Sequence, residues 1–463
     1  MRKNALKFTS NDEEISQLYK AHQQVINEAN LDKMAKETNF LTRKRKISPL
    51  AFLKALVFNE QNHEQLTLLG LKCELADQNI PKISQQAVHK RFTGSAVSFL
   101  QNVFSALLFN YFSFQNELDE DGGSPFTSIN IKDSTKFRLP ACYADIYPSF
   151  GRNAHDKAMM NIQYEYDLLN GQWKSMDFTK ANRNDQADSK QAADQIQPAS
   201  LNIRDLGYVT TTYLKAVDKN GAYYLNRLPG MGAYLFQDGK YVPVDWKQID
   251  RQMREQGLES MEMEVFINKK EKLKTRLILQ PVPKKIKDER IRKAKKAGKR
   301  TKGYNISKEY SIKAGYNIYI TNTVKKDLPT EKVHQTYRLR WQIELIFKTW
   351  KSNLEINKVK AVKKERMECQ LIAKFIWIML NSKLFQISNN IIREASAKMG
   401  CSHFKFFKRM KKLSHTLITA IESQDALIEW FKHNIIAVID EFIIDKKKGK
   451  STYPEILNEL IDP

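Results

Sequence analysis

Residues 161–178 read NIQYEYDLLNGQWKSMDF, and their alternation indicates the class of structure that the chain forms. Two alternating runs, 161–169 and 172–178, flank the pair Asn170-Gly171. Asn-Gly between alternating runs is the strongest short-range signal of a β-hairpin, because both central residues of its tight turn need positive φ. The stretch therefore predicts two antiparallel strands.

Further strands are predicted on both sides of this hairpin. Upstream, residues 128–133 alternate as a strand does and end on Asp133. Downstream, we expect a polar helix over 184–196, a strand over 201–204 followed by Asp205, another helix, and a strand over 222–227. Strand, hairpin, helix, strand, helix, strand is the order of an RNase H-like α/β core with a mixed five-stranded sheet.

An insertion interrupts this core from about residue 228 to 315. It contains β-like pieces and then a very basic run, in which eleven Lys or Arg lie between Lys284 and Lys302 against two acids. By itself, such a charge run is usually a solvated helix or a disordered loop. A strand over 316–320 then resumes the pattern, and Thr330 leads into a long helix.

Helical periodicity dominates both ends of the chain, so we expect three parts. These are a helical N-terminal domain (1–120), an α/β domain (121–362) that carries the β-rich and basic insertion, and a helical C-terminal region (363–463). The N-terminal part includes a predicted helix over 12–37.

One short N-terminal helix is a candidate for DNA contact. Ser84 caps a predicted helix over 85–92, which carries His89, Lys90 and Arg91. A serine-capped helix with an exposed basic end suits a major groove, as in a helix-turn-helix. A solvated helix in an all-helical domain explains the pattern equally well, and the segment alone leaves both interpretations open.

The charge balance indicates a polyanionic partner. Lys and Arg number 76 against 52 Asp and Glu, a formal net charge of +24. Such an excess is usually retained because nucleic acid neutralises it, with an anionic membrane as the rival partner. No apolar stretch approaches the roughly 20 residues that a membrane span needs, so we expect no membrane association.

Cysteine usage and the N-terminus indicate the compartment. The four cysteines lie far apart without paired spacing, which argues against a zinc site and against a disulfide framework. The first residues contain no apolar signal core. Both features predict a cytoplasmic protein.

The most informative helix spans residues 337–351, YRLRWQIELIFKTWK. At 100° per residue, its apolar residues gather on one side, as a core-packing stripe does. A second, narrow stripe consists of Tyr337, Arg340, Glu344, Lys348 and Lys351. Intrahelical ion pairs four residues apart on a surface helix account for the same stripe.

The identities of these residues resemble a known signature. Tyr337, Arg340, Glu344 and Lys351 stand at offsets of zero, three, seven and fourteen. Asp133-Ser134-Thr135 and Asp205-Leu206-Gly207-Tyr208 resemble the first and second aspartate motifs of the same family. In that order, the motifs resemble those of the insertion-sequence DDE transposases with the YREK signature, the cut-and-paste group that includes transposases of bacterial composite transposons.

The resemblance implies a metal-dependent active site. Asp133, Asp205 and Glu344 would be the catalytic carboxylates and the ligands of two Mg²⁺ ions, for which Mn²⁺ can substitute. Hard oxygen ligands suit Mg²⁺, and two ions stabilise both the attacking and the leaving oxygen of a phosphodiester. Tyr337, Arg340 and Lys351, assisted by Lys348, would grip DNA phosphates.

The resemblance also implies the substrates and the assembly. Terminal inverted repeats of the element would be cut, in some relatives through a hairpin, and joined to target DNA. The basic run, with Arg290, Arg292 and Lys293, is then expected to contact the DNA backbone. A homodimer is expected in the DNA complex, since two ends need two active sites, and the location would be the bacterial nucleoid.

Two other functions remain open at this stage. An RNase H-like nuclease would cut DNA without joining it, and an inactive DNA-binding regulator would bind ends without cutting. Each aspartate, taken singly, is also explained as the cap of a following turn or helix.

Overall fold

The computed structural model describes residues 8, 10–43, 45–58, 67–80, 83–112, 124–150, 157–181, 185–186, 189, 196–228, 230, 232–300 and 306–461. Most of the helix predicted over 184–196 lies outside these residues. Among the helices described, none combines the length and apolar character that crossing a membrane requires.

One mixed sheet organises the described part of the chain. Its strand order is β3-β2-β1-β4-β5-β10-β9-β8-β6-β7. The β1–β4 and β4–β5 pairs are parallel, and the remaining pairs are antiparallel. The strands are β1 (Ser128–Leu139), β2 (Ala158–Asp167), β3 (Gln172–Lys180), β4 (Ser200–Arg204), β5 (Tyr223–Arg227), β6 (Ala233–Gln237), β7 (Lys240–Pro243), β8 (Met261–Ile267), β9 (Leu273–Pro281) and β10 (Tyr316–Thr321).

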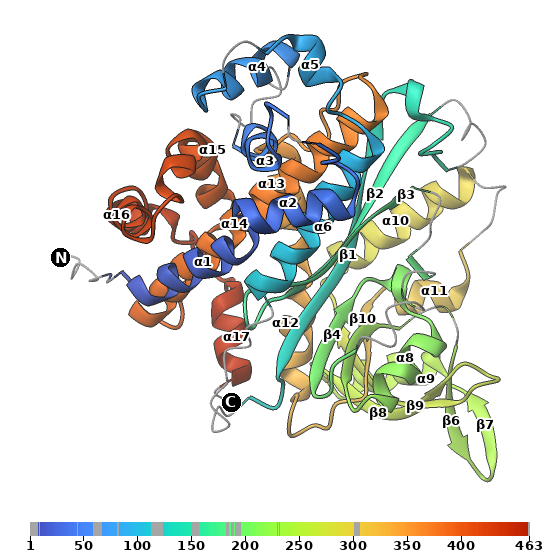
Figure 1. Cartoon of the computed structure of the whole chain (residues 1–463). Coiled ribbons are helices and arrows are strands. Elements are labelled where there is room, and N and C mark those ends of the chain that lie inside the picture. Colours follow the sequence, from blue (N-terminus) through green and yellow to red (C-terminus); the bar gives the residue numbers. More distant parts are fainter. Residues whose placement is uncertain are drawn as a thin grey trace.

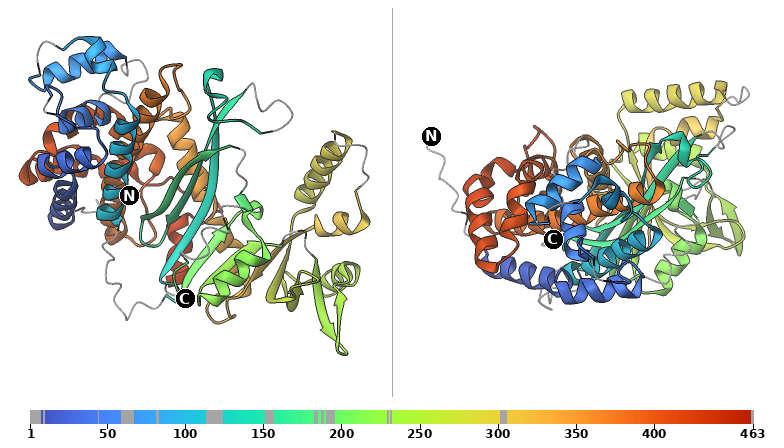
Figure 2. Two further views of the ribbon diagram at one scale, coloured as in Figure 1. Left: turned by 45° about the vertical axis from the view of Figure 1, so that its right-hand side comes forward. Right: turned by 45° about the horizontal axis from the view of Figure 1, so that its top comes forward.

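The five strands predicted for the core are present as β1 to β5, but the prediction of a five-stranded sheet is wrong. Within the described residues the sheet has ten strands. The reason is that β10 pairs with β5 on one side and with β9 on the other. The strands of the insertion therefore continue the same sheet, and Figure 2 shows α10 and the β6–β7 hairpin projecting at its far end.

The hairpin between β2 and β3 is longer at its turn than the Asn-Gly signal predicts. Asp167 pairs with Gln172, so four residues form the loop. Gly171 has a φ of 65°, whereas the φ of Asn170 is not positive. The Asp167 carboxylate accepts the backbone N–H groups of Leu169 and Asn170 and closes the loop.

Strand β1 also exceeds its prediction. It runs to Leu139, because residues 130–139 pair with β2, whereas its parallel pairing with β4 ends at Lys132. Asp133 therefore lies inside a strand and not at its end.

Helices from both ends of the chain pack together on one face of the sheet (Figure 1). The helix predicted over 12–37 is divided, because Asn27 caps a new helix after Val25. The helices in this group are α1 (Asp12–Val25), α2 (Glu28–Glu37), α3 (Pro49–Val57), α4 (Leu68–Asp77), α5 (Gln85–His89), α6 (Gly94–Phe112), α12 (Val333–Arg338), α13 (Trp341–Ser352), α14 (Lys364–Ala395), α15 (His403–Ala420), α16 (Gln424–Asn434) and α17 (Tyr453–Ile461).

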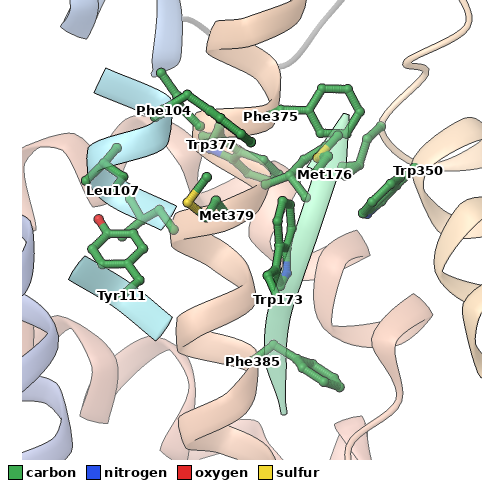
Figure 3. Close-up of a cluster of buried hydrophobic side chains, with 14 of the residues drawn as sticks. Phe104, Leu107, Tyr111, Trp173, Met176, Trp350, Phe375, Trp377, Met379 and Phe385 are labelled. Carbon is green, nitrogen blue, oxygen red and sulfur yellow. The ribbon is translucent and has the colours of Figure 1, made fainter. Parts of the chain in front are cut away.

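The largest core lies between these helices and the sheet. Figure 3 shows aromatic and aliphatic side chains of α6 and α14 meeting those of β3 and α13. Trp350 of α13 is fully buried, with its ring 4.9 Å from Tyr164 of β2 and 5.3 Å from Phe375 of α14. Buried aromatic side chains contribute much of the apolar area of a core, so Trp350 fixes α13 on the sheet.

A second core covers the other face of the sheet. It joins α8 (Thr211–Lys219) and α9 (Trp246–Glu255) to β5, β8, β9 and β10. Neighbouring residues of one strand divide between the two cores: Tyr224 belongs to the second core and Leu225 to the first. The insertion also contains α10 (Lys284–Arg300) and α11 (Lys308–Lys313).

Candidate active site

Two aspartates occupy matching positions at the point where β1 and β4 part. The parallel register ends with Lys132 opposite Arg204, and Asp133 and Asp205 are the next residues. Ile131 and Ile203, two residues earlier, are fully buried in the first core. Since side chains alternate along a strand, this places Asp133 on the face that α13 covers.

Asp205 is available to a ligand. It stands at the N-cap position of the 3₁₀ turn Leu206–Tyr208, but its side chain makes no capping hydrogen bond. Half of its side chain is exposed. The alternative explanation of this residue as a turn cap therefore finds no support.

The helix that carries the acidic residue of the third motif is broken, which corrects the prediction of one long helix. Residue Thr330 begins a 3₁₀ turn, α12 follows, and a tight turn at Leu339 and Arg340 separates α12 from α13. The N–H of Arg340 bonds to the carbonyl of Tyr337, a three-residue spacing that marks the break. Glu344 lies in the first turn of α13.

Arg340 contacts all three carboxylates. Its Nη1 lies 3.2 Å from Oδ2 of Asp133, its Nε lies 3.9 Å from Oδ1 of Asp205, and its Nη2 donates to Oε1 of Glu344. The three acids are separated by up to 211 residues in sequence, from Asp133 to Glu344, yet they surround a single guanidinium. The structure therefore brings the predicted carboxylates together.

The site holds more negative than positive charge. The pKa of Asp133 is raised to about 6, mainly by burial and to a smaller extent by the neighbouring Asp205 and Glu344 carboxylates, against the lowering effects of the Ser134 backbone N–H and of Arg340. The pKa of Arg340 is raised by its hydrogen bond to Glu344 and by nearby acids, which outweigh its own burial. One guanidinium facing three acids leaves a preference for additional cations.

The donor set fits a hard divalent cation, although the acids are not arranged as a finished cluster. Among the described residues, no three His, Cys, Asp or Glu side chains form a group ready to hold a metal ion. The guanidinium of Arg340 lies among the acids and forms ion pairs with them. Carboxylate oxygens are hard ligands of the kind that Mg²⁺ prefers.

Tyr337, which was predicted to grip a DNA phosphate, is largely buried. It is 6 % exposed and packs 5.1 Å from the ring of Tyr319, under the guanidinium of Arg227 at 5.6 Å. It does line a cavity of about 310 Å³ that also contains Arg227, Arg338 and Arg340. Sequence reasoning missed Arg227, which carried no motif signal at the end of β5.

The two lysines of the predicted stripe have different surroundings. Lys351 donates to the backbone carbonyl of Lys136 on β1, 3.0 Å away, and burial lowers its pKa. Lys348 is exposed and borders a different cavity, lined also by Trp341 and Leu345. Of these two lysines, Lys351 therefore is the one that contacts the strand carrying Asp133.

A buried ionic trio lies on the opposite face of β1 and β4. Glu165 of β2 is 3.6 Å from Nζ of Lys132 and 3.3 Å from Nη2 of Arg204. Lys132 is in register with both partners. The two cations keep the pKa of Glu165 below its ordinary value despite its burial, and the trio links the strands behind the two aspartates.

A fourth acid, Asp185, lies next to both aspartate motifs and was also missed. Its Oδ1 accepts hydrogen bonds from Oγ of Ser134 and from Nε2 of Gln163, each 3.1 Å long. Its Oδ2 lies 3.3 Å from the position that a Cβ on Gly207 would take. No sequence pattern marked it, because its partners are distant in sequence.

The basic helix of the insertion, α10, presents two kinds of cation. Arg292 and Lys293 are exposed. Arg290 instead donates to the carbonyls of Ala314 and Tyr316 and to Asn317, so its guanidinium holds α10 against β10. The expectation that Arg290 contacts DNA is thereby weakened for a structural reason.

The short N-terminal helix also departs from its prediction. Helix α5 spans only Gln85–His89, and Arg91 lies beyond it. His89 and Lys90 are exposed, but Arg91 is 7 % exposed, with its guanidinium 4.0 Å above the ring of Phe40. Arg91 is therefore a buried packing residue, and its expected role in DNA contact is corrected.

Comparisons with known proteins identify the family of the chain. A family model described as "Transposase DDE domain" matches residues 124–380. The transposase for insertion sequence element IS231E of Bacillus thuringiensis subsp. finitimus is 32% identical over 410 residues, covering 85% of this chain and 84% of that protein. The transposase for IS1151 of Clostridium perfringens is 28% identical over 442 residues, with 92% and 91% coverage.

A comparison of folds found a cryo-EM structure of a piggyBac transposase synaptic complex with hairpin DNA. It is 9% identical, with a TM-score of 0.43, and the match covers 97% of this chain and 90% of that one.

Proposed function

Because the chain belongs to the DDE transposase family and is a DNA transposase, we propose that it cuts the ends of its own element and joins them to target DNA, with Asp133, Asp205 and Glu344 as its catalytic carboxylates. The observation that carries this assignment is the contact of all three acids with the Arg340 guanidinium. The substrates are the terminal inverted repeats and a target duplex, in a cut-and-paste reaction.

The catalytic core is RNase H-like. Support comes from the order β3-β2-β1-β4-β5, in which only β1, β4 and β5 run parallel. Residues 121–362 form this catalytic domain, residues 1–120 form a DNA-binding domain, and residues 363–463 form a helical region that helps to pair two subunits. Light scattering of the DNA-bound protein tests the pairing, and a complex with only one subunit contradicts it.

Asp133, Asp205 and Glu344 hold a pair of Mg²⁺ ions, or Mn²⁺ in their place. When bound, the ions supply charge stabilisation for the attacking and the leaving oxygen of the phosphodiester. The excess of carboxylate over guanidinium charge supports this assignment.

Arg340 supplies a donor for a DNA phosphate beside the three acids. It contacts these acids, and its planar fork matches a phosphate as well as a carboxylate. With cations bound to the acids, its guanidinium would be available to the phosphate next to the scissile bond. Three further side chains complete the phosphate contacts. Arg227 and the hydroxyl of Tyr337 line the adjacent cavity, and Lys351 is held at β1. Lys348 lies at the periphery.

The exposed polar side chains of α10 and of the C-terminal end of α5 bind the DNA backbone. Arg292 and Lys293 of α10 and His89 and Lys90 at the end of α5 are exposed, and Figure 1 shows these two helices in different parts of the molecule. Their separation supports a duplex that extends from the active site across both regions. Non-specific phosphate contacts of this kind weaken as salt increases.

The assay that tests this function uses DNA that flanks the gene, incubated with the protein and Mg²⁺ or Mn²⁺. We expect breaks at both element ends and, with an added plasmid, covalent joining of those ends. Cleavage without joining indicates a nuclease, and binding without cleavage indicates a regulator; either result contradicts the proposal.

A further inference from the structure

Asp185 occupies a distinctive place relative to the two aspartates that follow β1 and β4. Oδ1 of Asp185 accepts the hydroxyl of Ser134, the residue directly after Asp133, and the amide of Gln163 on β2. Ser134 and Gln163 are paired in register on neighbouring strands. One carboxylate oxygen therefore joins β1 and β2 beside Asp133.

The same network reaches the segment that carries Asp205. Oε1 of Gln163 accepts the hydroxyl of Tyr208, at 2.6 Å, and the carbonyl of Tyr208 accepts the hydroxyl of Ser189. Tyr208 ends the 3₁₀ turn that begins directly after Asp205. Asp185 is thus connected to the residues that follow both aspartates.

Burial makes this network strong and specific. Gln163 and Tyr208 are each 1 % exposed. Hydrogen bonds in a low dielectric are strengthened, and a buried donor that loses its acceptor carries a desolvation cost. The side chains of Gln163 and Tyr208 consequently have one favourable arrangement, which Asp185 completes.

Gly207 permits the close approach of Asp185. Its φ is not positive, so its backbone conformation does not require glycine. Instead, a Cβ at this position would stand 3.3 Å from Oδ2 and 3.9 Å from Cβ of Asp185. The glycine is explained by the space that the Asp185 carboxylate occupies.

We propose that Asp185 is a positioning residue of the transposase active site, which fixes Asp133 and Asp205 relative to one another through Ser134, Gln163 and Tyr208. The inference rests on the proposed function, because it presumes that these two aspartates are catalytic. Asp185 acts from the face of the sheet that is opposite Arg340 and does not touch substrate.

The test compares Asp185→Ala with Asp185→Asn in the cleavage assay with element ends. The asparagine retains an acceptor oxygen for Ser134 and Gln163, whereas alanine does not. We expect Asp185→Ala to lower the cleavage rate about 10- to 100-fold, the usual effect of losing a group that orients a metal ligand, and to raise the Mn²⁺ concentration needed for half-maximal cleavage. Asp185→Asn restores most of the rate and keeps the wild-type unfolding temperature, and DNA affinity stays unchanged in both variants.

A second arm uses the glycine. Gly207→Ala alone slows cleavage because its methyl group displaces the Asp185 carboxylate, and the double variant Gly207→Ala/Asp185→Ala is no slower than Asp185→Ala. Asp177→Asn removes an exposed carboxylate on β3 and serves as the matched control with wild-type rate. The single variant Gly207→Ala keeps Asp185, so its cleavage rate tests the inference even where Asp185→Ala fails to fold.

Three results overturn the inference. The first is wild-type cleavage by Asp185→Ala, and the second is a double variant whose loss of cleavage rate is the product of the losses in Gly207→Ala and Asp185→Ala. The third is inactivation of Asp185→Asn to the level of Asp133→Asn, which makes Asp185 a metal ligand. Asp133→Asn is included as the reference. If it still cleaves, the proposed function fails; if it is inactive while Asp185→Ala is normal, only the positioning role fails.

Discussion

Asp133 and Asp205 are the first residues beyond the parallel ladder of β1 and β4, which ends with Lys132 opposite Arg204. Two strands that lie side by side thus deliver two carboxylates to the same edge. Helix α13 supplies the third carboxylate, Glu344, and the guanidinium of Arg340 at its N-cap contacts both Asp133 and Glu344. The following predictions test this arrangement.

Each of Asp133→Ala, Asp205→Ala and Glu344→Ala is expected to abolish cleavage of element ends while binding to those ends survives. The carboxylates are needed for cations and not for the fold, since Asp205 and Glu344 are partly exposed. Cleavage gels and gel-shift titrations measure the two properties separately. Full cleavage by any one variant removes that residue from the active site.

Arg340→Lys is expected to slow cleavage about 10²- to 10³-fold, the effect of losing one preorganised donor at a reacting group. Lysine keeps the charge, but an ammonium lacks the planar fork that reaches three carboxylates and a phosphate. Single-turnover rates provide the measurement. Lys348→Ala, at an exposed position of the same helix, is the control and changes the rate less than tenfold; equal effects of the two substitutions contradict the role of Arg340.

Glu165→Gln is expected to destabilise the protein by about 1–3 kcal/mol, because it removes the charge of the carboxylate that contacts both Lys132 and Arg204. Urea unfolding measures the difference in the free energy of unfolding. Asp177→Asn, on the neighbouring strand and exposed, changes stability by no more than about 0.5 kcal/mol. A Glu165 variant as stable as this control shows that the trio does not hold the strands.

Substitutions of Arg290 and of its neighbours on α10 are expected to affect different properties, namely stability for Arg290 and DNA affinity for the neighbours. Arg292→Ser and Lys293→Ser weaken DNA binding for all sequences and reduce the slope of log affinity against log salt by about 0.9 for each lost contact. Arg290→Ser lowers the unfolding temperature, since its guanidinium bonds to Ala314, Tyr316 and Asn317. A salt slope that only Arg290→Ser alters reverses this assignment.

Acidification below pH 6.5 is expected to destabilise the N-terminal helices through His22. Burial lowers the pKa of His22 to about 3, and its Nδ1 lies 2.7 Å from the hydroxyl of Tyr111. The folded-state pKa is below the unfolded value, so this stability is present above pH 6.5 and is lost as pH falls toward 3, at up to about 1.4 kcal/mol per pH unit. Urea unfolding at several pH values measures it, and His22→Gln should reduce the dependence; an unchanged slope in that variant excludes His22.

The sequence predicted the parts of the site that depend on local pattern. Alternation located β1 to β5 and placed Asp133 and Asp205 beside them, and the helical stripe grouped Arg340 with Glu344. The ten-stranded sheet was not predicted, because the pairing of β10 with β5 and β9 joins segments that are distant in sequence.

The remaining differences are tertiary in origin. Arg340 contacts Asp133 across 207 residues, and Asp185 contacts Ser134 across 51 residues; no periodicity encodes either contact. Arg91 and Tyr337 were expected at the surface because of their residue types, yet Phe40 covers one and Tyr319 and Arg227 pack on the other. Burial of long amphipathic side chains depends on what packs against them.

The most direct test of the carboxylate site is a crystal structure of the protein bound to element-end DNA and soaked with Mn²⁺, with anomalous scattering recorded to locate manganese. We expect manganese peaks within coordination distance of the carboxylates of Asp133, Asp205 and Glu344, with the Arg340 guanidinium moved to a DNA phosphate. Manganese bound elsewhere on the complex, with Arg340 still held among the three acids, would contradict the assignment.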